Sequence, residues 1–70
     1  MKYAVVFEKT GTGCSAYAPD LPGCIAAGTT LEETTTLIRE AMEMHVEGLR
    51  EDDEPIPEGT TIAGNIAVLV

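Results

Sequence analysis

The 70-residue chain has few basic residues, few aromatic residues and few cysteines. It contains 4 lysines and arginines against 12 aspartates and glutamates, so the formal net charge is −8 at pH 7. This charge argues against direct binding to nucleic acid or to an anionic membrane surface, because both would repel the chain. No apolar run approaches the roughly 18 residues of a membrane span, and no signal segment precedes the first apolar run. We therefore expect a soluble, cytoplasmic protein.

The cysteines and the single histidine make a disulfide framework or a metal site a poor explanation of stability. Cys14 and Cys24 allow one bridge at most, whereas secreted domains of this size carry more, so we expect two packed, unreactive thiols. These cysteines and His45 lack the spacing of a zinc site, and the sequence predicts no metal and no cofactor. A domain this small has a marginal core. Oligomerisation is the remaining source of stability.

The first 27 residues predict three short strands. Residues 3–7 are rich in β-branched and aromatic side chains, and the glycines of 11–13 indicate a hairpin turn. The second strand, residues 13–18, places Cys14, Ala16 and Ala18 on one face. Two prolines within residues 19–23 exclude a helix there and predict a rigid turn. A third strand over residues 24–27 follows.

A helix is predicted over residues 31–50. Thr30 can cap its first turn, and Glu33 can reach back to the amide of Thr30 as in a capping box. Side chains at helical spacing form a wide apolar stripe, which we expect to face the sheet. The stripe comprises Leu31, Ile38, Met42, His45 and Leu49, widened by Leu37, Ala41, Met44, Gly48 and Val46.

The opposite face of this helix is acidic, and the charge continues into the segment that follows. Residues 51–59 combine acidic residues with two prolines and a glycine, which is typical of a solvated connection. A solvated surface is the ordinary explanation of such residues, and a contact surface for a basic partner is the functional one. The candidate contact residues are Glu40, Glu43, Glu47, Asp52 and Asp53.

The last ten residues predict a fourth strand that is apolar on both faces. The fold class is therefore α+β, with the order β-β-β-α-β and one helix packed on one face of a mainly antiparallel sheet. A strand with two apolar faces needs more cover than one helix supplies, so we expect a homodimer or higher oligomer. The candidate interface residues are Ile62, Ile66, Val68 and Val70.

Two motifs in the sequence resemble a known family over about residues 2–57. Tyr17-Ala18-Pro19-Asp20-Leu21-Pro22-Gly23-Cys24 precedes Gly28-Thr29-Thr30-Leu31-Glu32-Glu33 and a helix, and Ile56-Pro57 comes after the helix. This pairing resembles the HicB-like antitoxins. The resemblance implies a partial ribonuclease-H-like fold and a module that neutralises HicA, a small basic toxin that cleaves messenger RNA. Many members carry a C-terminal DNA-binding domain, whereas we expect a single domain over residues 1–70 without one.

We therefore expect a non-catalytic binding module that inhibits a HicA-like toxin. The alternative is an orphan homo-oligomeric regulatory or scaffold protein without a toxin partner. A nuclease of the ribonuclease H type is the weakest hypothesis, because two-metal hydrolysis needs several carboxylates that converge on adjacent strands. Here only Glu8 lies near the end of a predicted strand, and Asp20 lies in a turn.

Overall fold

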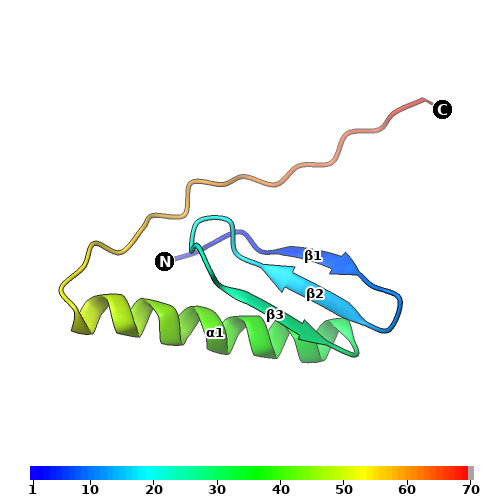
Figure 1. Cartoon of the computed structure of the whole chain (residues 1–70). Helices are drawn as coiled ribbons and strands as arrows, with labels where there is room; N and C mark the ends of the chain where they lie inside the picture. Colours follow the sequence, from blue (N-terminus) through cyan, green and yellow to red (C-terminus); the bar gives the residue numbers. More distant parts are fainter. Residues whose placement is uncertain (70) are drawn as a thin grey trace.

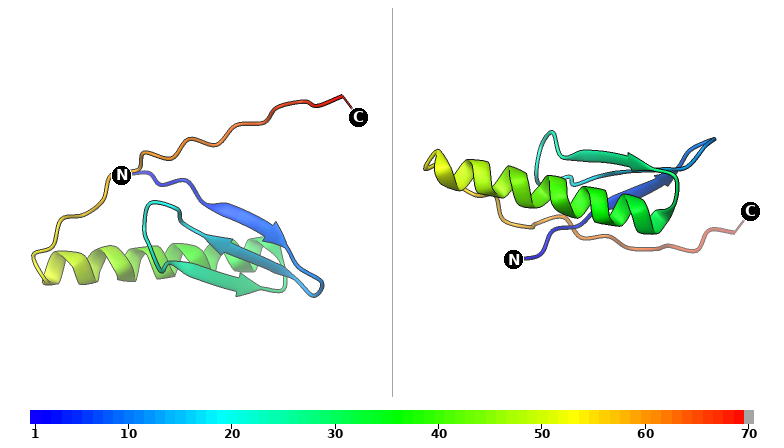
Figure 2. Two further views of the ribbon diagram at one scale, coloured as in Figure 1. Left: turned by 45° about the horizontal axis from the view of Figure 1, so that its top comes forward. Right: turned by 90° about the horizontal axis from the view of Figure 1, so that it is seen from below.

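The computed structural model describes residues 1–69 as a small α+β unit (Figure 1). Three strands, β1 (Val6–Lys9), β2 (Cys14–Tyr17) and β3 (Ile25–Gly28), precede one helix, α1 (Leu31–Glu51). The strands form one antiparallel sheet in the order β1-β2-β3, and the helix covers one face of it (Figure 2). This confirms the predicted fold class. Within residues 1–69, no helix combines the length and hydropathy required to cross a membrane.

The hairpin forms where the glycines predict it, but β1 begins three residues later than predicted. Val6 pairs with Tyr17, which is the last residue of β2. Ala18 donates its backbone N–H to the Cys24 carbonyl, and Pro19 has no N–H to donate, so the ladder to β1 stops there. Residues 3–5, which precede β1, therefore have no strand partner among residues 1–69. The alternation in β2 is as predicted, with Cys14 and Ala16 buried.

The turn between β2 and β3 supplies the centre of the hydrophobic core. Leu21 is fully buried and packs with Ala18 and Cys24. The turn is closed by two backbone hydrogen bonds, from Leu21 to the Ala18 carbonyl and from Cys24 to the Leu21 carbonyl, both at 3.1 Å. Gly23 has a φ of 88°, a left-handed conformation that favours glycine. The prolines and the glycine of this motif thus hold a leucine inside the fold.

The helix begins at the predicted cap. The backbone N–H of Glu33 donates to the Thr30 hydroxyl at 3.1 Å, but the Glu33 carboxylate accepts from the Thr29 amide at 2.7 Å, not from that of Thr30. The capping box is therefore displaced by one residue. Thr34, which the apolar pattern did not select, is fully buried, and its hydroxyl lies 2.7 Å from the Thr30 carbonyl and 3.3 Å from that of Cys14. It joins the helix to β2.

The buried stripe of the helix is narrower than the sequence predicts. Ile38 is buried and Met42 and Val46 are partly buried against the core, whereas Leu31, Leu37 and Met44 are exposed. The helix packs over β3 and β2 rather than over β1. A sheet of three four-residue strands is too narrow to cover more than one side of the helix. Part of the predicted apolar stripe therefore faces outward.

The predicted fourth strand is not formed over residues 61–69. This segment is exposed and extends away from the sheet without a ladder partner (Figures 1 and 2). A strand needs a neighbour for its backbone groups, and none of the three strands pairs with it. Val70, the last residue of the prediction, lies outside the described residues. We refer to residues 62–69 as the C-terminal arm.

Candidate partner-binding site

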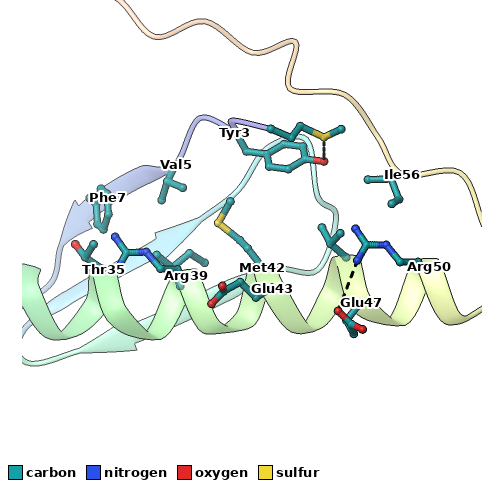
Figure 3. A pocket seen from close by; sticks show the side chains of 13 residues that line it. Tyr3, Val5, Phe7, Thr35, Arg39, Met42, Glu43, Glu47, Arg50 and Ile56 are labelled. Atoms are coloured by element: carbon teal, nitrogen blue, oxygen red, sulfur yellow. Dashed lines mark hydrogen bonds and ion pairs between the residues drawn. The ribbon is translucent and has the colours of Figure 1, made fainter.

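An open groove lies between the first strand and the helix, because the helix is offset toward β3. Its volume is about 610 Å³. Tyr3, Val5 and Phe7 line one wall, where alternate residues of an extended chain point the same way. Figure 3 shows Val5 and Phe7 directed toward the helix. The other wall is formed by Ile38, Met42 and Val46 of α1.

Charged side chains of the helix also border the groove. Arg39, Glu43, Glu47 and Arg50 line its helical side (Figure 3). An ion pair of 3.9 Å joins Arg50 to Glu47, and both side chains are about two-thirds exposed. Exposed pairs of this kind contribute little to stability. These charges are therefore available to a partner that approaches the groove from the helix side.

The structure brings three of the five predicted acidic contact residues onto one helical surface. Glu40, Glu43 and Glu47 are exposed and are spaced by three and four residues, so they follow one another along one side of α1. Asp52 and Asp53 are exposed but lie beyond the end of the helix and do not line the groove. Carboxylates at a helix C-terminus meet the negative end of its dipole. A basic partner would relieve this unfavourable placement.

Asp20 holds the base of the C-terminal arm, a role that no sequence pattern indicates. Its carboxylate accepts hydrogen bonds from the backbone N–H groups of Thr60 and Thr61 at 3.0 and 2.9 Å, and from both hydroxyls. These bonds, chiefly those from Thr61, hold the pKa of Asp20 below its ordinary value. The Tyr3 hydroxyl also donates to the Pro57 carbonyl. The segment after the helix is thus tied back to the turn and to the N-terminus.

The predicted oligomer-interface residues within the arm are all exposed. Ile62, Ile66 and Val68 are between 74% and 92% accessible, and Leu69 is fully accessible. Val70 belongs to the same predicted set and lies outside the described residues. None of the described residues after Ile56 lines the groove. The arm and the groove are therefore two separate apolar surfaces of one small protein.

Both cysteines are free and buried. The Cys24 thiol lies 3.7 Å from the Ala41 carbonyl, and burial raises its pKa. A raised pKa keeps the thiol protonated and therefore a poor nucleophile or metal ligand at neutral pH. Within residues 1–69, no three side chains of histidine, cysteine, aspartate or glutamate come together in a group that could hold a metal ion.

Comparison with known proteins identifies relatives across nearly the whole chain. The chain is 42% identical over 62 residues to a 14.9 kDa protein of Haemophilus phage HP1; the match covers 89% of this chain and 47% of the phage protein. The chain thus spans about half the length of that relative. It is also 36% identical over 69 residues to a UPF0150 protein of Synechocystis, covering 97% of this chain and 87% of the relative.

A solved structure and a family model give the same assignment. A chain in a HicA3 and HicB3 toxin–antitoxin complex superimposes with a TM-score of 0.70 and 32% sequence identity, covering 86% of this chain and 70% of that one. The family model of the HicB-like antitoxin of bacterial toxin–antitoxin systems matches residues 3–68. By sequence and by fold, the chain belongs to the HicB-like antitoxins.

Proposed function

We propose that this protein binds and neutralises a small, basic, RNA-cleaving toxin of the HicA type, in the cytoplasm where such a toxin meets its RNA. The supporting observation is the likeness to a chain of a HicA3 and HicB3 complex over 86% of the sequence. A protein that holds RNA must carry positive charge for the phosphate backbone. The formal net charge of −8 on this chain is complementary to such a partner.

The proposed contact surface is the acidic side of the helix together with the segment after it. Glu40, Glu43 and Glu47 are exposed, and Asp52 and Asp53 continue the same sign of charge past the helix end. Arg50 is paired with Glu47 only through a long, exposed contact. Neutralisation by this surface requires binding and no chemical step, so we propose a non-catalytic role without a cofactor.

The test is charge reversal of this surface, with binding to the toxin measured by calorimetry. The toxin to be tested is any small basic protein that the neighbouring reading frame encodes. Changing Glu40, Glu43 and Glu47 to lysine changes the formal net charge from −8 to −2. Each exposed charge pair is worth about 0.2–1 kcal/mol, and reversal replaces attraction with repulsion, so we expect roughly a tenfold to a thousandfold weaker affinity. The loss should shrink at high salt.

A matched control changes Glu8, Thr10, Thr12, Ile25 and Ala27 to lysine, which gives the same net charge of −2 at exposed positions outside the helix and the segment after it. This control should retain most of the affinity, because the contact surface stays intact. Equal losses in the two variants would show that only net charge matters. No loss in either variant would place the toxin contact elsewhere on the molecule.

A second copy of the chain is the other partner that we propose. The exposed apolar arm and the open groove favour self-association, since a 70-residue domain has little core to spare. The same surfaces support the alternative function, an orphan homo-oligomeric regulatory or scaffold protein. A basic neighbouring gene product that co-purifies with this chain would support the antitoxin, and its absence would support the orphan.

A further inference from the structure

The C-terminal arm has the composition of a buried strand but no cover in the structure. Residues 59–69 contain no charged side chain, although the whole chain is 23% charged. Ile62, Ile66 and Val68 lie on one face of the extended arm and are exposed. Large contiguous apolar surfaces on a soluble protein indicate an interaction site. The arm therefore has the chemistry of a strand that binds another surface.

The base of the arm is fixed beside the residues that lead into β1, and the arm runs on from there without pairing with that strand (Figure 1). Asp20 lies in the turn between β2 and β3, and its bonds to Thr60 and Thr61 hold the base of the arm beside that turn. Gly59 passes so close to Lys2 that a Cβ there would collide with the Lys2 carbonyl. These contacts define where the arm leaves the fold. They do not bring it to the groove of its own chain.

The groove and the free edge of β1 fit the arm in chemistry and in length. β1 is an edge strand of the sheet, so one side of its backbone has no ladder partner among residues 1–69. The extended stretch from Tyr3 to Lys9 spans about 23 Å, and the eight residues of the arm span about 26 Å at the same rise per residue. Val5 on one wall and Met42 on the other are apolar, as the arm is. An uncharged arm has no charge complementarity to a basic toxin.

We propose that the arm of each copy lies along the β1 edge of a second copy and inserts Ile66 and Val68 into its groove. The exchange is reciprocal, so both copies use the same two surfaces, as in a twofold-symmetric dimer. It buries the apolar face of the arm, fills the groove beside Met42 and pairs the free edge of β1. The inference rests on the proposed self-association and is independent of the toxin.

The first test compares two arm variants of the full chain by light scattering and sedimentation. The variant Ile66→Asp/Val68→Asp places charges on the face that enters the groove, and we expect the dimer dissociation constant to rise about tenfold or more. The control Asn65→Asp/Ala67→Asp adds the same charge to the opposite face and should dissociate far less. Neither variant alters the described core, and circular dichroism checks that both fold.

The second test locates the contact by filtered nuclear Overhauser spectroscopy on a mixture of isotope-labelled and unlabelled protein. We expect intermolecular contacts from the methyl groups of Ile66 and Val68 to Val5 and Met42. Contacts within one copy only would show that the arm fills its own groove and would overturn the exchange. A dimer that survives the Ile66→Asp/Val68→Asp change would overturn the arm contact but not self-association. A 7.4 kDa monomer at all concentrations would overturn both.

Discussion

Replacing Leu21 with alanine should remove most of the stability of this domain. Leu21 is 0% exposed and packs with Ala18 and Cys24 inside the turn between β2 and β3. Partly buried Met42 and Val46 of the helix close over the same cluster. The cost of the change has two parts, the lost transfer of the leucine side chain from water and the cavity that it leaves.

For a leucine that is fully buried, these parts together amount to about 3 kcal/mol. A 70-residue core supplies only about 3–5 kcal/mol of net stability, so the variant should be close to unfolding at 25 °C. The melting temperature should fall by about 12–24 °C, since 1 kcal/mol corresponds to about 4–8 °C in a domain of this size. The urea midpoint should fall by about 2–3 M.

The assay is urea and thermal unfolding followed by circular dichroism at fixed protein concentration. The matched control is Leu31→Ala, which deletes the same atoms from a side chain that is 58% exposed. It should cost less than about 1 kcal/mol. If Leu21→Ala and Leu31→Ala lower stability by the same amount, the turn is not the centre of the core and the argument fails.

Three further predictions concern hydrogen bonds and thiol chemistry. Hydrogen bonds from Thr61 hold the pKa of Asp20 in the folded protein below its ordinary 3.8, so this anchor persists above that pH and is lost as pH falls through the depressed value. The chemical shift of the Thr61 amide, followed against pH, reports this titration. A midpoint at or above 3.8 would contradict the prediction. Thr34→Val should lower stability by about 1 kcal/mol in urea unfolding, because the buried bond to β2 is lost, whereas exposed Thr36→Val should cost little. Burial raises the pKa of Cys24 above its ordinary 9.0, so Cys24 should react with a thiol reagent much more slowly in folded than in urea-unfolded protein; equal rates would refute its burial.

The elements that depend on local chemistry could be predicted from the sequence. The helix start follows from Thr30 as a cap, and the turn follows from the prolines of residues 19–23. The bounds of β1 could not be predicted, because they depend on where β2 loses its partners near Pro19. The prediction of a fourth strand was wrong for a similar reason. An apolar pattern states that a segment can pair, but not that a neighbour is present.

The candidate site was predictable only where it consists of neighbours along one helix. Glu40, Glu43 and Glu47 lie on one surface because helical spacing requires it. The groove depends on the offset of the helix toward β3, which no sequence pattern indicates. Asp20 contacts Thr60 across forty residues, and nothing in the spacing of these residues announces that pairing.

The Pro-Asp-Leu-Pro-Gly-Cys motif is internal scaffolding. Leu21 and Cys24 are buried, Gly23 sets the backbone, and Asp20 binds the base of the arm, whereas none of these residues lies on the acidic surface of the helix. Relatives that keep the motif can therefore change the helix surface without disturbing the turn. Under the proposed function, paralogues within one genome keep a common frame and differ in partner through the helix surface, which begins about twenty residues downstream of the motif.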